Sequence, residues 1–168
     1  WTGFAAVAAA VVLLDPGAFS QGYETLEGLD AILVTHQHVD HLDLEKLPAL
    51  LGQNPDAELV VDPGTAEQLR ERDIAHTVRE PGESFTVAGT TVEVIGGAHA
   101  VIHPDIPQIA NNGYLIDGTV LHPGDSFTIP SVTPPVLLLP TAGPWLKASE
   151  AVDYLRAVAP PLAVPIHE

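Results

Sequence analysis

The sequence predicts an α/β protein in which short strands and helices form a layered sandwich. Apolar runs that end at polar or turn-forming residues alternate with a few segments of helical periodicity. Sixteen prolines and fourteen glycines indicate many turns rather than a helical bundle. With 168 residues, 46% of them hydrophobic, the chain can bury one sizeable core, so we expect residues 1–168 to form a single domain.

Short apolar runs predict the strands. Two segments are expected to form hairpins: Phe85–Ile95 turns near Gly89, and Tyr114–Leu121 turns at Asp117-Gly118, a strong two-residue turn signal. The other predicted strands are Val11–Leu14, Ala31–Val34, Leu59–Val61, Val136–Leu139 and Leu162–Val164. The last two are continuous apolar runs, so we expect them to be buried on both faces of a sheet.

Three segments carry helix signals. Asp43–Leu51 opens with a residue that can cap the first turn, and Thr65–Arg72 follows Pro63-Gly64. Ser149–Val158 has Ser149 as its expected cap, followed by apolar residues at helical spacing. Strands and helices therefore alternate along the chain, as expected for an α/β sandwich.

Composition excludes several kinds of site and partner. The chain has no cysteine, so any transition metal must be held by imidazole and carboxylate groups. A net charge of −16 argues against nucleic-acid and anionic membrane surfaces, which require clustered basic residues. The apolar start WTGFAAVAAAVVLL is too short to span a bilayer and lacks a basic leader. We expect a cytoplasmic protein that acts on a small molecule; its oligomeric state stays open.

The strongest functional signal is LVTHQHVDHLD at residues 33–43. It brings four metal-capable side chains directly after an apolar run: His36, His38, Asp40 and His41. His36 and His38 are two residues apart, so in an extended segment their rings project to the same side. Asp40 and His41 then require a turn in the chain, where we expect the helix from Asp43 to begin. A solvent-exposed histidine-rich loop is the alternative interpretation.

Further metal-capable side chains follow the later predicted strands. His99 comes just after the run ending at Ile95, Asp125 follows the run ending near Leu121, and His167 follows the last run. Loops at the ends of strands commonly carry function on a rigid scaffold, so these side chains can converge at one sheet edge.

Other polar residues near these positions have two readings each. His99 and His103 are alternative candidates for the same ligand position. We favour His99 as the ligand, with His103 lining the pocket or supporting a ligand. His122 is either a hydrogen-bonded turn residue or a residue that supports the site or contacts substrate. His76 is expected to be an ordinary strand residue.

Four more residues are assigned from their local context. Asp15 starts an Asp-Pro-Gly turn and can also support the histidine-rich loop. Asp43 is expected to cap a helix rather than bind metal. Trp145 and Lys147 either line the pocket, where Lys147 would offset an anionic substrate, or belong to a surface segment that leads into a helix.

Taken together, these residues resemble the metallo-β-lactamase-fold superfamily, and within it the L-ascorbate-6-phosphate lactonase-like hydrolases. The motifs occur in family order over nearly the whole chain from Val11: Asp15-Pro-Gly, Thr35-His-Gln-His-Val-Asp-His41, His99, Gly124-Asp125 and Pro165-Ile-His167. The resemblance implies an αββα sandwich with a two-metal centre between the sheets. By the same resemblance, the first metal is bound by His36, His38 and His99, the second by Asp40, His41 and His167, and Asp125 bridges the two.

The resemblance further implies a metal-dependent hydrolase. Two metals roughly 3.5–4 Å apart can generate a bridging hydroxide and polarise the substrate oxygen. Asp40 and Asp125 would position the metals and the hydroxide. A lactone or another carboxylic ester is the favoured substrate; the alternatives are a phosphodiesterase acting on a small molecule and a non-catalytic, metal-stabilised binding domain. Two divalent ions are expected as cofactors, with zinc favoured over manganese or iron.

Both ends of the sequence depart from the family pattern. Family members usually show Gly-His-Ala near the N-terminus, where this chain has Gly3-Phe4-Ala5, and the chain contains no methionine. One residue follows His167. We therefore expect a sequence that is truncated or edited at both ends, and a second metal that binds more weakly than the first because His167 can fray.

Overall fold

The computed structural model describes residues 10–167, so Gly3-Phe4-Ala5 and most of the Ala-rich start lie outside the described residues. The chain divides into two compact units. The N-terminal unit contains the residues up to Arg79 together with Thr86–Thr90. The C-terminal unit contains Glu80–Phe85 and the residues from Thr91 onwards. A single domain over residues 1–168 stays a prediction.

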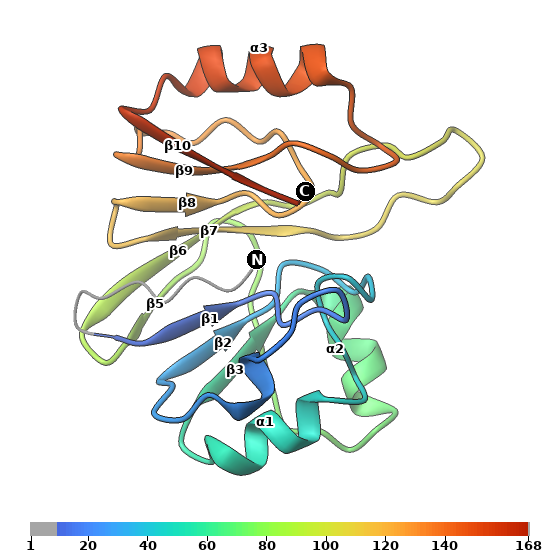
Figure 1. Ribbon diagram of the computed structural model, residues 1–168, viewed down its shortest axis with the longest axis vertical. Helices are drawn as coiled ribbons and strands as arrows, with labels where there is room; N and C mark the ends of the chain where they lie inside the picture. Colours follow the sequence, from blue (N-terminus) through green and yellow to red (C-terminus); the bar gives the residue numbers. More distant parts are fainter. Residues whose placement is uncertain (1–9, 168) are drawn as a thin grey trace. The chain divides into compact units, whose positions relative to one another are not determined.

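The N-terminal unit is built on a four-stranded parallel sheet in the order β1-β2-β3-β4, of which Figure 1 labels β1, β2 and β3. The strands are β1 Val12–Leu14, β2 Ala31–Leu33, β3 Glu58–Val61 and β4 Thr77–Val78. The first three confirm the predicted apolar runs. The fourth was not predicted, because a strand of two residues is too short to show an alternation of apolar and polar residues.

Two helices, α1 Leu47–Gln53 and α2 Pro63–Arg70, and the short 3-10 helix η1 Tyr23–Thr25 complete this unit. The predicted start of α1 at Asp43 is wrong, because residues 44–46 form a turn before the helix. Asp43 does cap that turn, since its Oδ1 accepts from the N–H groups of Glu45 and Lys46. The cap of α2 is Asp62, which accepts from two backbone N–H groups.

The apolar faces of both helices pack on the sheet of the N-terminal unit. Leu47 and Leu50 of α1 and Leu69 of α2 belong to the same buried cluster as Ile32 and Leu59 of the strands. Burying such side chains contributes about 1.5–3 kcal/mol each. The loop that follows β2, which carries the histidines, therefore starts from a firmly packed strand.

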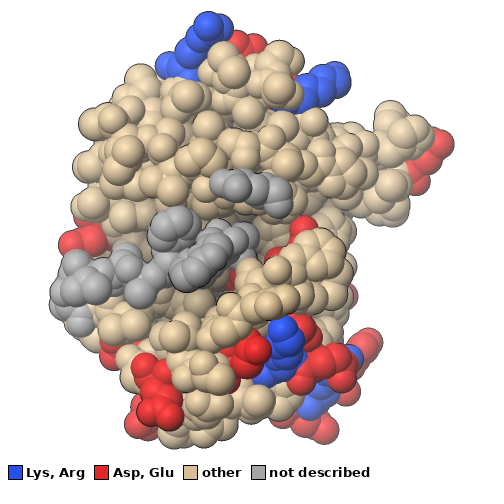
Figure 2. Space-filling model, viewed as in Figure 1, with Lys and Arg blue, Asp and Glu red and all other residues tan. Residues whose placement is uncertain are grey.

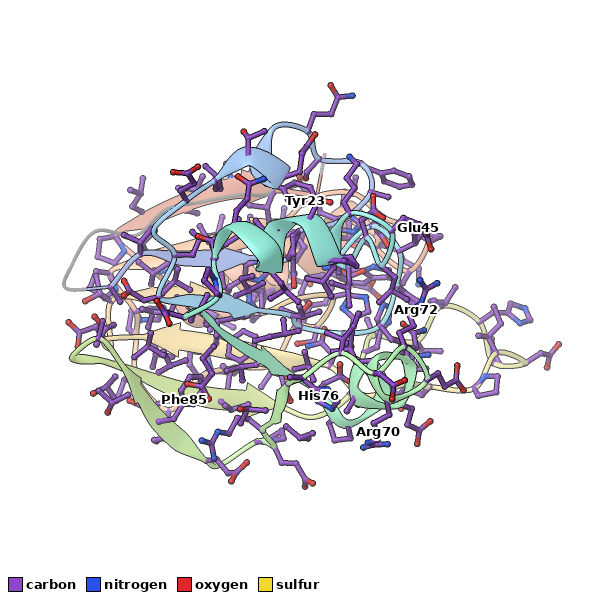
Figure 3. The ribbon with its side chains drawn as sticks, turned by 90° about the horizontal axis from the view of Figure 1, so that it is seen from below. Tyr23, Glu45, Arg70, Arg72, His76 and Phe85 are labelled. Atoms are coloured by element: carbon purple, nitrogen blue, oxygen red, sulfur yellow. The ribbon has the colours of Figure 1, made fainter. Side chains whose placement is uncertain are left out.

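At the surface of this unit, one ion pair joins the turn before α1 to the end of α2. Arg72 Nη1 lies 3.0 Å from Glu45 Oε1, with both side chains exposed (Figure 3). Exposed pairs of this kind contribute little to stability. His76 lies in the connection that leads into β4 (Figure 3), where its Nδ1 is 2.8 Å from the Ile74 carbonyl. It thus precedes a strand instead of lying in one.

The second sheet, most of whose residues belong to the C-terminal unit, is mixed and six-stranded, in the order β10-β9-β8-β7-β6-β5. The strands are β5 Ser84–Val87, β6 Thr90–Gly96, β7 Asn112–Ile116, β8 Val120–His122, β9 Val136–Pro140 and β10 Leu162–Ile166. β8, β9 and β10 are parallel to one another, whereas β7 is antiparallel to both β6 and β8. Every strand predicted in this part of the sequence is present.

The predicted turns of both hairpins are confirmed. Ala88 and Gly89 join β5 to β6 with φ angles of 45° and 87°. Asp117 and Gly118 join β7 to β8 with φ angles of 51° and 61°. Positive φ at both central residues is the mark of the two-residue turn whose twist matches the flanking strands.

The helix α3 Ala148–Val158 packs on this sheet, where Tyr154 and Val158 join the cluster of Leu121 and Leu137 (Figure 1). The predicted cap Ser149 is wrong. The cap is Lys147, whose backbone N–H donates to the Glu150 side chain at 3.2 Å.

The structure contradicts one prediction about the burial of a strand. The expectation that Leu162–Val164 is buried on both faces is wrong, since β10 is an edge strand and Leu162 is 53% exposed.

Within residues 10–167, no helix is long and apolar enough to cross a membrane. On the face that Figure 2 shows, the described basic side chains lie in small separate groups, with acidic side chains close to several of them. The absence of a nucleic-acid partner stays a prediction.

Candidate functional site

The histidine-rich loop of the N-terminal unit directly follows β2. His36 Nε2 lies 3.0 Å from His38 Nδ1, and the two rings meet edge to face. The rings therefore project to the same side, as predicted from their spacing. The N–H groups of His41 and Leu42 both donate to the His38 carbonyl, which turns the chain. After this turn, His41 Nε2 lies 3.7 Å from Asp40 Oδ2, so the loop presents two pairs of metal-capable atoms.

Asp15 holds this loop from the end of β1. Its Oδ1 accepts the Thr35 N–H at 2.8 Å, and its Oδ2 accepts the Thr35 hydroxyl at 2.9 Å. The same Oδ2 lies 2.7 Å from His41 Nδ1. A carboxylate at this distance favours the His41 tautomer that donates from Nδ1 and keeps its lone pair on Nε2, the atom facing Asp40. Asp15 thus both starts the Asp-Pro-Gly turn and supports the loop, as predicted.

Close backbone contact fixes the Asp-Pro-Gly turn against the loop. The N–H of Ala18 donates to the Val39 carbonyl at 2.8 Å, and the N–H of Asp43 donates to the Pro16 carbonyl at 2.9 Å. A Cβ atom on Gly17 would collide with the Asp40 carbonyl. Only glycine fits this position, because the two backbones approach so closely.

The start of α2 supports the loop from another direction. A Cβ atom on Gly64 would collide with the Gln37 side chain, so Gln37 lies tightly against the first turn of α2. Asp62, fully buried, caps this turn by accepting from the N–H groups of Gly64 and Thr65. Burial raises the pKa of Asp62, although these hydrogen bonds act to lower it.

In the C-terminal unit, Asp125 lies between two histidines. Its Oδ2 is 3.3 Å from His99 Nε2, and its Oδ1 is 3.5 Å from His167 Nε2. His99 lies between β6 and β7, Asp125 follows β8 and His167 follows β10. The structure thus brings together three predicted site residues that are far apart in the sequence; their role as metal ligands stays a prediction.

Backbone carbonyls orient both of these imidazole rings. His99 Nδ1 lies 2.6 Å from the Ala100 carbonyl, and His167 Nδ1 lies 2.8 Å from the Ala142 carbonyl. Each ring therefore donates from Nδ1 and turns its Nε2 lone pair toward Asp125, the arrangement typical of metal-binding histidines. The residue before His167 is also held, because Thr141 donates twice to the Ile166 carbonyl. A weaker second metal site stays a prediction.

Two residues that support Asp125 were missed or left undecided by the sequence. Asn111 brackets the Asp125 loop: its Oδ1 accepts the Asp125 N–H, and its Nδ2 donates to the Pro123 carbonyl, both at 2.9 Å. Trp145 Nε1 donates to Asp125 Oδ2 at 2.6 Å. The only sequence signal for Asn111 is a polar residue shortly before the apolar run that starts at Tyr114, which is common without any such role.

Three residues with open interpretations are now placed. His122 is buried, and its Nδ1 accepts the Gly124 N–H at 3.0 Å, which supports the reading as a turn residue. The His103 side chain is 60% exposed and its Nδ1 accepts the Asp105 N–H, so it lies outside the cluster of Asp125 and does not line it. The Lys147 side chain is 79% exposed and precedes α3, in line with the surface alternative.

The donor atoms in each unit fit a divalent transition metal. They are imidazole nitrogens and carboxylate oxygens, a set that suits zinc, manganese or iron. In a tetrahedral site with bonds of roughly 2.0–2.1 Å, neighbouring ligand atoms are about 3.3 Å apart. The four donor pairs are separated by 3.0, 3.7, 3.3 and 3.5 Å. Each pair therefore has a spacing at which both atoms can bind one ion.

Comparison with known proteins identifies relatives along almost the entire chain. A family model described as "Beta-lactamase superfamily domain" matches residues 5–167. Protein Rv0786c of Mycobacterium tuberculosis is 52% identical over 162 residues, which cover 94% of this chain and 75% of the relative. The UPF0173 metal-dependent hydrolase MJ1163 of Methanocaldococcus jannaschii is 26% identical over 154 residues, covering 86% of this chain and 69% of the relative.

A solved structure has the same fold. It is a candidate metal-dependent hydrolase from Parabacteroides distasonis, with a TM-score of 0.76 and 25% identity. The match covers 94% of this chain and 74% of that structure. The predicted fold class, α/β of the metallo-β-lactamase type, is therefore confirmed.

Proposed function

We propose that this chain, which belongs to the β-lactamase superfamily and is a metal-dependent hydrolase, cleaves a lactone or another carboxylic ester at a centre of two divalent ions. The observation that carries the proposal is the complementarity of the two clusters. The N-terminal unit offers two pairs of donor atoms, and the C-terminal unit offers one carboxylate with a histidine facing each oxygen. Neither cluster completes a site alone, whereas the two together supply ligands for two ions.

The proposed assignment of ligands follows from these pairs. His36 and His38 would bind the first ion together with His99, and Asp125 would add its Oδ2, the oxygen nearest His99. Asp40 and His41 would bind the second ion together with His167, and Asp125 would add its Oδ1. Such sites keep an open position, as catalytic rather than structural metal sites do.

The ions, when bound, supply an activated water as the nucleophile and polarise the substrate carbonyl. The protein holds the ligand side chains in fixed positions. Asp125 is almost fully buried, with 4% of its side chain exposed, and would supply a fixed carboxylate to both ions. The Asp40 side chain is 24% exposed, so it is the carboxylate that water and substrate reach, and it would position the attacking water. Asp15 and Thr35 hold the histidine rings while charge shifts on the substrate.

An apolar rim beside the histidine-rich loop supports a substrate with an apolar part. Val39, between two proposed ligands, is 60% exposed, and Phe19 is 82% exposed. The two are linked through the bond from the Ala18 N–H to the Val39 carbonyl. An ester or lactone with an aliphatic portion could contact these side chains while its carbonyl reaches the ions.

Metal removal and restoration test this function. We expect chelation to abolish hydrolysis, and zinc or manganese to restore it on members of a panel of lactones, carboxylic esters and phosphodiesters. His41→Ala should lose activity, whereas His76→Ala, a histidine of the same unit away from the loop, should retain it. Restored activity on phosphodiesters alone would replace the proposed substrate class. Full metal loading without turnover of any substrate would favour a binding domain.

A further inference from the structure

Trp145 is an aromatic residue that donates a hydrogen bond to a proposed ligand, Asp125. It lies between β9 and α3 and is 7% exposed. Its indole N–H donates to Asp125 Oδ2 at 2.6 Å. A bond from a neutral N–H to a carboxylate is charge-assisted and stronger than a neutral one. The contact therefore acts on the residue that the proposed function makes common to both ions.

Packing fixes the plane of the indole ring. The ring meets His99 edge-on, with centroids 5.9 Å apart at 74° between planes. It meets Phe127 in the same way, with centroids 5.2 Å apart at 61°. Phe127 in turn contacts Tyr154 of α3. Because two aromatic neighbours contact the ring and its N–H is hydrogen-bonded to Asp125, the direction of this N–H is set before any ligand binds.

Gly143 preserves the space that the indole occupies. Its φ angle is 140°, a value that residues with a side chain rarely adopt. A Cβ atom at this position would lie 2.9 Å from Trp145 Nε1 and 3.4 Å from His167 Cε1. The turn between β9 and α3 is thus shaped so that the indole and the His167 ring can approach Asp125 together.

The bond determines how the carboxylate is presented. Held by Trp145 through Oδ2, Asp125 directs that oxygen toward His99 and the other oxygen toward His167. Without the bond, the carboxylate can rotate about its Cβ–Cγ bond, and then neither oxygen is assigned to one histidine. We propose that Trp145 is a positioning residue that sets the orientation of Asp125 so that each oxygen serves a different metal ion. This inference rests on the proposed two-metal function.

The substitution Trp145→Phe tests the role with little change in packing, since phenylalanine keeps an aromatic ring against His99 and Phe127. We expect the affinity for zinc, measured by isothermal titration, to fall about 10–100-fold for at least one ion, as is typical when a partner of a ligand is removed. Under saturating zinc, kcat should fall while KM stays nearly constant. A further substitution, Gly143→Ala, should weaken zinc binding in the same direction by displacing the indole.

Tyr154→Phe is the matched control. Tyr154 contacts Phe127, the same ring that contacts Trp145, and donates a hydrogen bond to the Thr128 carbonyl at 2.9 Å. It does not contact Asp125. We expect this variant to lower Tm slightly and to leave both zinc affinities unchanged. A comparable loss of zinc affinity in both variants would show that Trp145 acts only through packing, and would overturn the proposal.

The indole N–H also gives a direct spectroscopic reading. The sequence has two tryptophans, so Trp1→Phe leaves Trp145 as the single indole. In a ¹H–¹⁵N spectrum, we expect its signal to lie downfield, to move on addition of zinc and to move upfield in Asp125→Ala. An indole signal that is indifferent to both changes would overturn the proposal.

The outcomes separate this proposal from the function on which it rests. If the wild type binds two zinc ions and hydrolyses substrate while Trp145→Phe binds zinc within about twofold of the wild type, the positioning role alone is refuted. If the wild type binds no zinc, the two-metal function fails, and the positioning role fails with it.

Discussion

The two clusters of proposed ligands are built in different ways. In the N-terminal unit, the four proposed ligands lie within one loop, which Asp15 holds through Thr35 and His41 and which the Asp-Pro-Gly turn and the start of α2 also contact. In the C-terminal unit, the three proposed ligands come from three separate connections, and hydrogen bonds to backbone carbonyls, Asn111 and Trp145 orient them. One carboxylate thus holds two residues of the contiguous motif, whereas each dispersed ligand has a hydrogen-bond partner of its own.

Asp125→Ala should have the largest effect, because it removes the carboxylate that faces both histidines of the dispersed cluster. We expect zinc affinity to fall more than ~100-fold for both ions, beyond the 10–100-fold typical of a supporting residue. Asp105→Ala, in an exposed loop of the same unit, is the control and should bind zinc normally. Two ions bound by Asp125→Ala with wild-type affinity would contradict a shared carboxylate.

The second prediction concerns the choice between two histidines. His99→Ala should lose the first ion, since buried His99 faces Asp125 at 3.3 Å. His103→Ala should bind zinc like the wild type, because its side chain is 60% exposed and contacts Asp105. Titration of both variants with zinc measures the difference. A greater loss in His103→Ala would mean that the wrong histidine has been assigned.

Asp15→Ala tests how far the contiguous loop depends on the carboxylate that holds Thr35 and His41. We expect a loss of about 10–100-fold in affinity for the second ion, because the His41 ring loses the partner of its Nδ1. Asp30→Ala is the matched control: Asp30 also accepts a backbone N–H in this unit, from Val11 at 2.7 Å, without contacting the loop. Equal effects of the two substitutions on zinc affinity would show that Asp15 acts only through general stability.

The smallest expected effect concerns Asp62, the cap of α2. Burial raises its folded-state pKa above the unfolded value, so the charged form is disfavoured in the folded protein. The wild type should therefore be most stable relative to Asp62→Asn in acid, and should lose that advantage as pH rises through the folded pKa. Urea unfolding of both proteins between about pH 3 and 7 measures this. A stability difference that does not vary with pH would contradict it.

Local chemistry explains which features the sequence could predict. Apolar runs and the Asp117-Gly118 turn carry their structure within a few residues, so most strands and both hairpins were predicted. The exposure of β10 and the two-residue β4 depend on which strands are neighbours, and the pattern of one strand does not contain that information. The second helix begins at Pro63, two residues before its expected start, and the cap of the third helix is Lys147, two residues before the predicted Ser149.

The candidate site shows the same division between local and distant information. The spacing of His36 and His38 predicts that their rings lie together, since two residues of extended chain decide it. The supports of Asp125 could not be predicted, because Asn111 and Trp145 reach it through loops whose course follows from the packed sheet. Sequence reasoning thus proposed the ligands, and the structure shows which residues contact their side chains.

The number of zinc ions bound by His38→Ala, by His99→Ala and by the double variant tests the central claim most directly. The claim is that one ion is shared by ligands from both clusters. If it holds, the wild type binds two ions, each single variant retains one, and the double variant also retains one, because both substitutions remove ligands from the same ion. Full loss of zinc from the double variant, with one ion left in each single variant, would mean that each cluster binds its own ion and would contradict the account.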